Sequence, residues 1–584
     1  MKVVVVGGVA GGMSAAARLR RLDESADIVV LERDDYVSFA NCGLPYHIGG
    51  DIEEREALLL QTPQSLKESL ALEVRTGHEV VSIDRVAHTV SVHERASGRN
   101  YVEPYDKLVL ATGASPLRPP LPGIDHPCIL TLRSIPDMDE IIAVLDAGAS
   151  SAVVIGGGYI GLEMTEALRH RGLHVTLVEA LPQVMAVIDP EMAQHLQDHL
   201  VDHGVRLLLS TRAAAFNDDH GQVVVDLESE QITTDLVVLA VGVRPESRLA
   251  NEAGLALSER GAVIVDQHMM TSDLDVYAVG DSVQVTDTVT GEPGVVPLAG
   301  PANRQGRVAA DHIAGRPSTY TSTQGTGIVK LFELTAGMTG VTETRLKQLG
   351  RDYRKVHVHP NGHASYYPGT HPMHLKVLFD PVDGRLLGAQ AVGVDGVDKR
   401  IDVLAVALRA QMTIEDLEHL ELAYAPPYGS AKDPVNMAGF VGSNVRRGDV
   451  ALWYAEEWPN IPEGTVLLDV RSPAENNLWS IPGSLLIPLK ELRARVHEIP
   501  VGANVLVYCR SGFRSYLAQR FLVQSGWPSA RTLAGGELTF RAVHPDGSAG
   551  WLEYPVVTYA EDQLAARQSV RAARASAGVR TASP

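Results

Sequence analysis

Residues 151–179 contain, in order, a predicted strand, a glycine turn, a helix, a second strand and an acid, and few folds accommodate this order. The stretch "SAVVIGGGYIGLEMTEALRHRG" holds a G-x-G-x-x-G pattern and is followed by "HVTLVE". Glycines let the backbone approach a pyrophosphate, and the free N–H groups at a helix start favour its charge. The residues expected to face the nucleotide are Gly156, Gly158, Tyr159, Ile160 and Gly161. In this order the pieces predict a dinucleotide-binding domain rather than an empty glycine turn.

The acid that closes this run, Glu179, predicts which nicotinamide cofactor is used. A carboxylate at this place bonds the ribose hydroxyls and repels a 2′-phosphate. NADH is therefore favoured over NADPH.

A second unit of the same kind begins the chain. "KVVVV" predicts a buried parallel strand, "GGVAGGMSAAARLRRL" a tight turn that opens a helix, and "DIVVLE" a strand ending in an acid placed to bond a ribose. Val9 stands where the strict pattern has its middle glycine. The residues expected around this nucleotide are Gly7, Gly8, Ala10, Gly11, Glu32 and Arg33. Two such units predict two bound dinucleotides, or one domain inserted in another.

Composition excludes several other classes. The net charge of −20 argues against a general nucleic-acid surface, and no stretch approaches 18 apolar residues, so no membrane span is expected. The three cysteines, Cys42, Cys128 and Cys509, lie far apart and form no CxxC pair. They indicate a reducing cytoplasm and neither a disulfide framework nor a cysteine zinc site, and no metal site is expected.

Further short motifs complete a family pattern. "ATGASP" (111–116), "AVGVRP" (240–245) and "VYAVGD" (276–281), together with the two glycine units, resemble the flavin-dependent pyridine nucleotide-disulfide oxidoreductases over roughly residues 1–445. The resemblance implies an α/β protein with two Rossmann-like domains, FAD on the first unit and NAD(P)H on the second, and an α+β dimerisation domain in a homodimer. The cofactor contacts that it adds are Asn41, Thr112, Gly113, Gly242 and Asp281, the last against the flavin ribityl chain.

The same resemblance implies where the domains begin and end. The FAD domain takes residues 1–115 and 247–322, the NAD(P)H domain residues 116–246, and the dimerisation domain residues 325–445.

The stretch "SFANCGLPY" indicates the chemistry. Dithiol members of the superfamily carry a CxxxxC pair, whereas here Ser38 stands four residues before Cys42 and no second cysteine follows. The stretch resembles the single-cysteine branch, which holds coenzyme A disulfide reductases, persulfide-reducing relatives, and NADH oxidases and peroxidases. Reduced flavin passes two electrons to an acceptor sulfur held beside its ring, and we interpret Cys42 as the residue that holds it. An inert buried thiol is the alternative.

Coenzyme A carries a 3′-phosphate and a diphosphate, so its site needs clustered cations. Arg18 and Arg21 lie three residues apart on the predicted first helix. The resemblance adds the further candidates Ser38, Asn41, Lys67 and Arg304. Solvated surface arginines are the alternative interpretation.

Two tyrosine clusters lie in the predicted dimerisation domain, "HASYYPG" (363–369) and "AYAPPYGSAKDP" (423–434). The resemblance implies that Tyr366 and Tyr424 reach the cysteine of the partner subunit. There a phenol would donate a proton or stabilise a leaving thiolate. A packing role as half-buried tyrosines is the alternative.

A new pattern begins near residue 455. "EGTVLLDVRSPAE" predicts a strand and turn, and "NVLVYCRSGFRSYLAQRFLVQSGW" a buried strand, a loop and a helix. The loop N–H groups, the helix start, Arg510 and Arg514 would lower the pKa of the Cys509 thiol and hold an anionic persulfide. With "LAGGELTF" (533–540) this part resembles a rhodanese domain, a second α/β fold, over residues 455–564.

Two details qualify that resemblance. The C-x4-R loop is one residue shorter than the C-x5-R loop of related phosphatases and suits a sulfur atom. Trp479 and Ser480 stand where many rhodaneses have a Gly-His pair. The tail, residues 565–584, is rich in Ala, Arg and Ser, has no acid, and is expected to be disordered.

The main hypothesis is an FAD-dependent NAD(P)H:coenzyme A disulfide or persulfide (polysulfide) reductase fused to a sulfurtransferase. Electrons pass from NADH through FAD to sulfur bound at Cys42, and Cys509 accepts or delivers persulfide sulfur from small inorganic donors. One alternative is an NADH oxidase or peroxidase that cycles Cys42 through a sulfenate. Another is a redox-sensing flavoprotein that controls partner docking. The protein is expected in the cytoplasm, without nucleic-acid or membrane partners.

Overall fold

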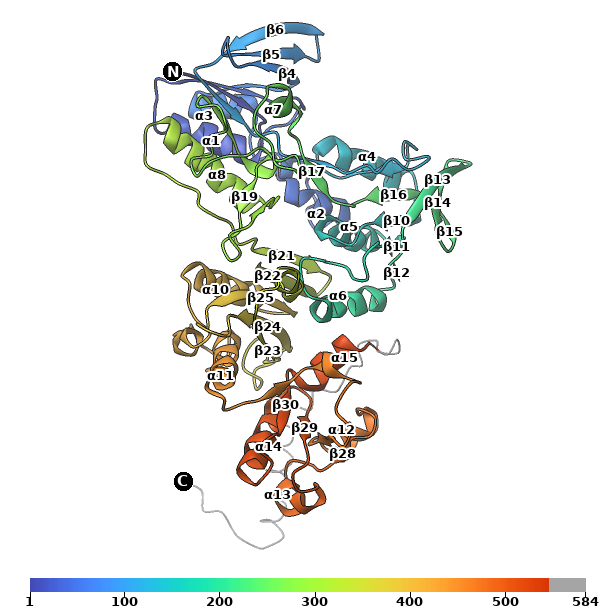
Figure 1. The fold of residues 1–584 in the computed structure, drawn as a ribbon. Coiled ribbons are helices and arrows are strands. Elements are labelled where there is room, and N and C mark those ends of the chain that lie inside the picture. The colour runs from blue at the N-terminus through green and yellow to red at the C-terminus, as the bar shows by residue number, and fades with distance from the viewer. Residues whose placement is uncertain (546–584) are drawn as a thin grey trace, which may run out of the picture. The chain divides into compact units, whose positions relative to one another are not determined.

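The computed structural model describes residues 1–545, which pack as two units (Figure 1). The first unit contains Met1–Ala186 and Gly204–Phe332, and the second contains Val187–His203 and the described residues from Glu333 to position 545. The predicted tail, residues 565–584, and the end of the predicted rhodanese range lie outside the described residues.

A five-stranded parallel sheet forms one core of the first unit. Its strands, in order, are β18 (Val276–Ala278), β7 (Lys107–Leu110), β1 (Lys2–Val6), β2 (Asp27–Leu31) and β3 (Glu73–Arg75). Val3 and Val5 of β1 pack with α1 (Ala10–Arg20) and α8 (Ala299–Ile313), which lie side by side in Figure 1. Val4 and Val6 pack on the other face. A strand buried on both faces needs a continuous apolar run, which explains the four valines.

The other face of this sheet is covered by an antiparallel sheet of β4 (His78–Asp84), β5 (Thr89–Glu94) and β6 (Arg99–Pro104). Since β18 comes from a late segment, the sheet draws on two separate parts of the chain. The smaller elements are η1 (Asn41–Gly43), α2 (Leu44–Gly49), η2 (Arg55–Leu58), α3 (Pro63–Leu70), α7 (Arg248–Glu252), η3 (Gly280–Ser282), β19 (Val285–Thr286), β20 (Pro293–Gly294) and β21 (Gly327–Leu331).

A second parallel sheet repeats the arrangement. Its order is β12 (Arg206–Leu208), β11 (His174–Val178), β10 (Ser151–Ile155), β16 (Leu236–Leu239) and β9 (Ile129–Leu130). With it lie α4 (Ile135–Asp146), α5 (Tyr159–His170) and the antiparallel strands β13 (Ala213–Asp219), β14 (Gln222–Leu227) and β15 (Gln231–Thr234). The antiparallel pair β8 (Ala114–Pro116) and β17 (Val243–Pro245) forms where the chain enters and leaves this part.

The second unit contains an antiparallel sheet with the neighbours β22 (Leu334–Gly340), β25 (Leu386–Gly393), β24 (Met373–Phe379) and β23 (Arg354–Val358). Its helices are α6 (Pro190–Asp202), α9 (Glu343–Gln348), α10 (Val397–Arg409), η4 (Asp416–His419) and α11 (Pro434–Arg447). Leu375 and Val377 of β24 join the apolar core with α10 and α11. His374 and Lys376 point to the opposite face, because side chains alternate along a strand.

That opposite face holds a buried charge cluster. The Lys376 ammonium is fully buried and lies 2.9 Å from Asp189, 2.5 Å from Glu191 and 2.6 Å from Glu343. The carboxylates surround a cation that the chain itself supplies. Asp189 and Glu191 bring α6 to this unit, although their numbers lie in the range predicted for the NAD(P)H domain.

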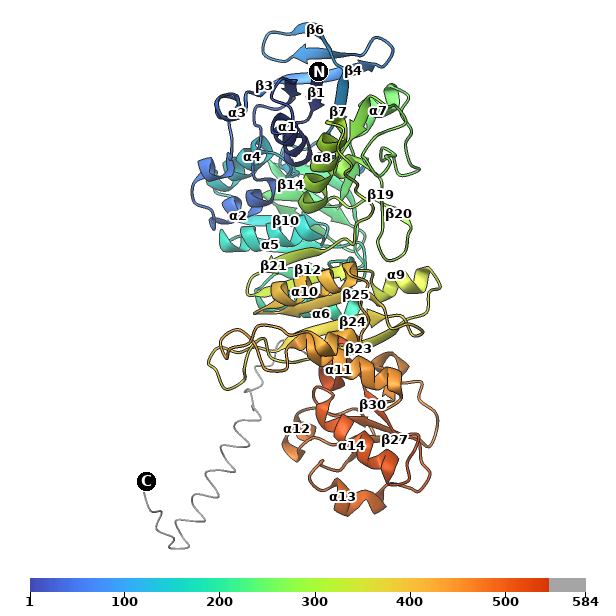
Figure 2. The ribbon, with the colours of Figure 1, turned by 90° about the vertical axis from the view of Figure 1, so that its left-hand side faces the viewer.

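A third parallel sheet follows in the order β26 (Leu452–Trp453), β30 (Arg531–Leu533), β29 (Val505–Tyr508), β27 (Val466–Asp469) and β28 (Leu485–Leu486). The surrounding helices are η5 (Ala455–Glu457), α12 (Pro473–Leu478), α13 (Leu492–Arg495), η6 (Val496–Glu498), α14 (Phe513–Gln524) and α15 (Gly536–Val543). Helix α14 packs against β29 and β30 and lies over the sheet in Figure 2.

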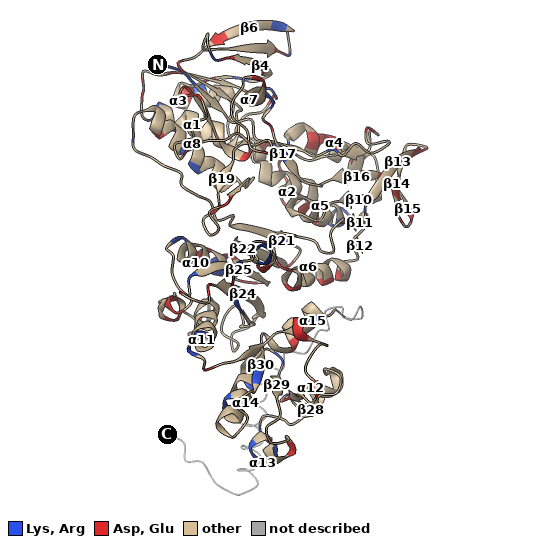
Figure 3. Ribbon diagram, viewed as in Figure 1, with Lys and Arg blue, Asp and Glu red and all other residues tan. Residues whose placement is uncertain are grey.

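These observations confirm the predicted fold class: two Rossmann-like domains, an α+β domain and a further α/β domain. None of the helices within residues 1–545 combines the length and apolar character needed to cross a bilayer. Basic and acidic residues are interspersed over both units (Figure 3), although acids prevail in the total.

Candidate functional site

In the glycine turn after β10, neighbouring backbone segments lie too close together for side chains at two of the glycines. Gly156 has φ +106°, and a Cβ there would lie 2.4 Å from the Ala240 carbonyl oxygen. A Cβ on Gly161 would lie 1.8 Å from the Gly156 oxygen, whereas one on Gly158 would meet nothing within 4 Å. The backbone at Gly158 is therefore open to a ligand. Tyr159 and Ile160 start α5 directly after it, and so present the helix N-terminus to that space.

Glu179 follows β11 and reaches back to this turn. Its carboxylate accepts hydrogen bonds from the N–H groups of Gly157, at 2.6 Å, and Leu181, at 2.8 Å. The acid thus stands beside the turn, where the ribose of a dinucleotide would lie.

The turn after β1 has the same geometry. Gly7 also has φ +106°. The Glu32 carboxylate accepts from the N–H groups of Gly8, at 2.7 Å, and Asp34, at 3.0 Å. Burial raises the pKa of Glu32. Ala10 and Gly11 begin α1, and Arg33 is partly exposed beside Asp34. The residues present at both turns therefore fit a dinucleotide.

Predicted flavin contacts gather around Arg133, which the sequence did not single out. Its guanidinium donates to the Thr112 carbonyl at 3.2 Å, and its own carbonyl accepts from Asn41 Nδ2 at 3.3 Å. Burial raises the pKa of Asp281, and the charge of Arg133 opposes that shift. Gly113, with φ +69°, follows Thr112, and Gly242, with φ +110°, precedes β17.

Cys42 lies in η1, one turn before α2. The residue is exposed, yet desolvation of its sulfur, followed by the charges of Glu163 and Asp281, raises the pKa of the thiol. Glu163 itself accepts a 3.3 Å hydrogen bond from the Tyr46 hydroxyl, and burial raises its pKa to about 7. Tyr46 and Glu163 are 117 residues apart, so no local motif could have indicated this pair.

The predicted coenzyme A residues are found in different settings. Arg18 makes an ion pair with Asp311, with Nη2 2.7 Å from Oδ1. Arg21, Lys67 and Arg304 have exposed side chains. Ser38 has φ +48°, and its N–H donates to the Gly8 carbonyl at 2.8 Å, which holds the stretch before Cys42 against the first glycine turn.

The two predicted tyrosines meet. The hydroxyl oxygens of Tyr366 and Tyr424 are 2.9 Å apart, and the residues are 68% and 48% exposed. This hydrogen bond raises the pKa of Tyr366. These two phenols are not packed in the apolar core, so a second molecule can contact them.

Cys509 follows the central strand β29, and its loop encloses the sulfur. The Gly512 N–H points at the sulfur, with nitrogen and Sγ 3.2 Å apart, and Ser515 Oγ lies 3.4 Å from Sγ. Arg514 forms a two-bond ion pair with Glu475, at 2.5 and 2.8 Å. Together with other bonds, this pairing lowers the pKa of Glu475 to about 2. Arg510 is partly exposed beside Cys509.

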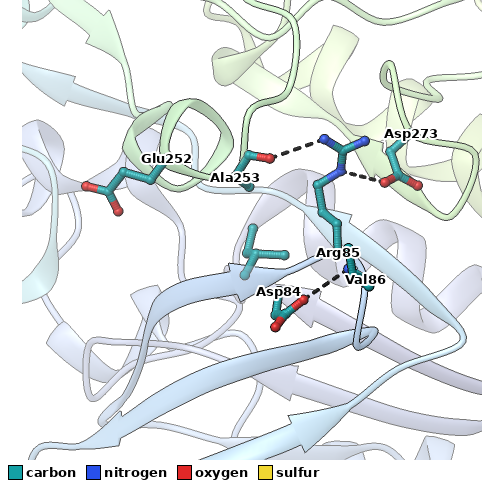
Figure 4. Close-up of a pocket in the computed structure, with 7 residues that line it drawn as sticks. Asp84, Arg85, Val86, Glu252, Ala253 and Asp273 are labelled. Carbon is teal, nitrogen blue, oxygen red and sulfur yellow. Dashed lines mark hydrogen bonds and ion pairs between the residues drawn. The ribbon is translucent and has the colours of Figure 1, made fainter.

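The first unit also has a pocket of about 530 Å³ (Figure 4). Its lining includes Asp84, Arg85, Glu252, Ala253 and Asp273. Arg85 spans the pocket, donating to Asp273 at 2.6 Å and to the Ala253 carbonyl at 3.2 Å. None of the predicted site residues lines this pocket.

Two nucleotide turns, a lone cysteine after the first of them and a separate cysteine loop define a flavin- and pyridine-nucleotide-dependent oxidoreductase that carries a second sulfur-handling domain. The chain belongs to the pyridine nucleotide-disulphide oxidoreductase family, whose model matches residues 1–306. The dimerisation domain of that family matches residues 326–433, and a rhodanese-like domain matches residues 455–541.

Individual relatives agree with this assignment. The chain is 37% identical over 442 residues to a coenzyme A disulfide reductase of Staphylococcus aureus, covering 75% of this chain and 99% of the relative. The structure of reduced Bacillus anthracis CoADR-RHD is 47% identical with a TM-score of 0.91, covering 93% of this chain and 98% of that one. An NAD-dependent persulfide reductase from A. fulgidus is 38% identical with a TM-score of 0.88, covering 92% and 100%.

Proposed function

We propose that the chain is an FAD-dependent NAD(P)H:coenzyme A disulfide or persulfide reductase with a fused sulfurtransferase. The observation that carries the proposal is the lone Cys42, exposed in a turn that Ser38 ties to the first glycine turn. The proposal is supported by the similarity to a coenzyme A disulfide reductase and to an NAD-dependent persulfide reductase, together with the rhodanese-like domain. A homodimer in the reducing cytoplasm fits the dimerisation domain and the three free cysteines.

In the reductase half, bound flavin supplies the path for two electrons from nicotinamide to sulfur. The Cys42 thiolate attacks the coenzyme A sulfur of a disulfide, forms a mixed disulfide and releases coenzyme A thiolate. With a coenzyme A persulfide the same attack releases hydrosulfide. Two electrons and a proton then cleave the mixed disulfide to the Cys42 thiolate and coenzyme A thiol.

The residues around Cys42 supply the proton. Glu163, with a pKa of about 7, exchanges a proton near neutral pH, and Tyr46 holds its carboxyl. The Tyr366–Tyr424 pair is proposed to protonate or stabilise the leaving thiolate at the partner subunit's cysteine.

In the sulfurtransferase half, the Cys509 thiolate takes the outer sulfur of thiosulfate or a polysulfide. An S–S bond breaks in the donor, sulfite or a shorter polysulfide leaves, and a Cys509 persulfide forms. An acceptor thiolate then removes that sulfur. The Gly512 N–H, which points at the sulfur, would bond the anionic persulfide, and the adjacent Arg510 would add positive charge; small inorganic donors are the proposed partners.

An anaerobic assay tests the proposal. Purified enzyme with NADH and coenzyme A persulfide is expected to release one sulfide for each NADH oxidised. The rival NADH oxidase has an observation in its favour, a water-forming NADH oxidase from Lactobacillus brevis that is 29% identical with a TM-score of 0.74. NADH turnover with oxygen or peroxide that exceeds turnover with every sulfur acceptor would reject the reductase and support the oxidase.

A further inference from the structure

Three histidines of the second unit, of which His374 is buried and the other two are half-buried, form a chain that ends beside the Cys509 loop. His195 lies on α6, His374 on β24 and His359 directly after β23. The rings of His195 and His374 stack with centroids 3.7 Å apart, and the Nδ1 atoms of His374 and His359 are 2.8 Å apart. Nε2 of His359 lies 2.9 Å from Oγ1 of Thr539 on α15. The proposed function uses none of these side chains.

The surroundings favour the neutral form of these rings. Burial lowers the pKa of all three, and neighbouring histidines and Arg510 lower that of His359 further. Two neutral rings that face each other through Nδ1 share one hydrogen, so one ring donates and the other accepts. Nε2 of His359 then has the opposite role toward Thr539, whose hydroxyl can donate or accept. The bond to α15 is therefore made in either tautomer.

His359 and Thr539 enclose a turn that has no spare room. Gly535, with φ +70°, precedes α15, and a Cβ on it would lie 1.9 Å from Thr539 Oγ1 and 2.8 Å from His359 Nε2. A Cβ on the next residue, Gly536, would lie 2.5 Å from the Cys509 carbonyl oxygen. The Gly535–Gly536 turn is therefore closely packed between the His359 side chain and the backbone of Cys509.

The start of α15 is bonded directly to the sulfur loop. The Glu537 N–H donates to the Cys509 carbonyl at 2.8 Å, and the Leu538 N–H donates to the Arg510 carbonyl at 3.1 Å. Within the loop, the Gly512 N–H points at Cys509 Sγ. A displacement of the turn would therefore move the carbonyls that set the direction of the loop.

We infer that His359 is a positioning residue of the sulfurtransferase site, which holds the Gly535–Gly536 turn so that α15 fixes the Cys509 loop around its sulfur. The inference rests on the proposed function and deepens it. His359 lies outside the matched rhodanese range, residues 455–541, so the sulfur loop depends on a side chain of the neighbouring domain. That domain then supports sulfur transfer as well as dimerisation.

The experiment compares His359→Leu, His359→Gln and the control His419→Gln in the full-length holoenzyme. His419 is an exposed histidine of the same unit. The readouts are kcat/KM for transfer from thiosulfate to a thiol, the pH profile of iodoacetamide alkylation at Cys509 followed by peptide mapping, and NADH-dependent coenzyme A disulfide reduction.

We expect His359→Leu to lower sulfur transfer by about tenfold to a hundredfold, the cost of misplacing a reacting group. The alkylation profile should shift, while disulfide reduction stays within about twofold of wild type. In His359→Gln an amide near the position of Nε2 should restore most of the transfer. His419→Gln should behave as wild type.

Unchanged transfer and alkylation in His359→Leu would overturn the inference. Equal losses in both His359 variants, with a matching loss of disulfide reduction, would also overturn it, since they would indicate general damage to the unit. If the wild type transfers no sulfur from thiosulfate, the sulfurtransferase proposal fails, and the Cys509 alkylation profile still decides the role of His359.

Discussion

Cys42 is surrounded by groups that disfavour its negative charge, since desolvation, Glu163 and Asp281 all raise the pKa of its thiol. A thiol is already reduced, so in the proposed mechanism Cys42 accepts electrons only as the mixed disulfide that it forms with a substrate. We predict that Cys42→Ser keeps flavin reduction by NADH but loses reduction of disulfides and persulfides. Stopped-flow absorbance measures the first step, and steady-state kcat/KM the second.

The matched control is Cys128→Ser, because Cys128 lies in a loop before β9 and has no assigned role. It should keep the wild-type rate. A Cys42→Ser enzyme that retains more than about a tenth of wild-type kcat/KM, a loss under ~1.4 kcal/mol of transition-state stabilisation, would remove Cys42 from the mechanism.

Glu179 is expected to select the nicotinamide cofactor. Its carboxylate is held beside the glycine turn by two N–H groups, where it would bond ribose hydroxyls and repel a 2′-phosphate. The wild type should prefer NADH by kcat/KM, and Glu179→Ala should reduce that preference by about tenfold, one lost charge contact. The control is Glu228→Ala, which removes an exposed acid directly after β14 of the separate antiparallel sheet. Equal wild-type use of NADPH would mean that neighbouring residues outweigh the acid.

At the scale of elements, the predicted strands and glycine turns are found where local patterns indicated them. The apolar runs of β1, β10 and β29 and the acids after β2 and β11 are properties of short segments, so a sequence reveals them. Tyr46–Glu163 and Lys376–Glu191 are contacts across more than 100 residues. The sequence of α6 does not predict that this helix packs in the second unit, because an amphipathic pattern shows which face is buried but not which element covers it.

Helix α6 is held by the Lys376 cluster, which gives a stability prediction. Lys376→Met would leave three buried carboxylates without their shared cation and should lower the free energy of unfolding by about 3–5 kcal/mol. Lys347→Met is the control. It removes a partner of the same Glu343 at 2.8 Å, but its side chain is 59% exposed, so the loss should stay under about 1 kcal/mol.

Denaturant unfolding followed by fluorescence measures both variants. If Lys376→Met is too unstable to purify, the double variant Lys376→Met/Glu191→Gln should recover part of the yield, since it removes one uncompensated charge. Equal stability of the Lys376 and Lys347 variants would contradict the assigned role of the cluster.

For the molecule as a whole, the three linked histidines predict sensitivity to acid. His195, His359 and His374 have pKa values below their usual 6.5, that of His195 at about 4. A histidine whose pKa is lowered by folding contributes its full stability above the unfolded pKa, and this contribution is lost as the pH falls toward the folded pKa. For His195 the loss amounts to about 3 kcal/mol.

The unfolding temperature of the second unit should therefore fall between pH 7.5 and pH 5, measured by calorimetry. Glu191 and Glu343, whose pKa values Lys376 holds down, add a loss of the same sign below about pH 4.5. His195→Gln should flatten the slope between pH 6.5 and 5. An unchanged slope would assign the acid sensitivity to other groups.

The domain order of the whole chain was predictable from its motifs, but the motifs do not state whether the two sulfur sites work separately. The Cys509 loop has its own sulfur contacts, and the reductase half has its own cysteine and both nucleotide turns. We predict that Cys509→Ser keeps reduction of preformed coenzyme A persulfide, and that it abolishes sulfur transfer from thiosulfate or polysulfide to a thiol.

Whether sulfur passes from one site to the other can be tested by comparing two sulfur substrates. If sulfur passes from Cys509 to coenzyme A before reduction, NADH oxidation with an inorganic donor plus coenzyme A will fall in Cys509→Ser, while oxidation with coenzyme A persulfide will not. Ser is close to Cys in volume, so the buried loop should keep its packing. Equal loss with both substrates would contradict separate sites, because it would mean that Cys509 supports the reductase fold or the Cys42 site itself.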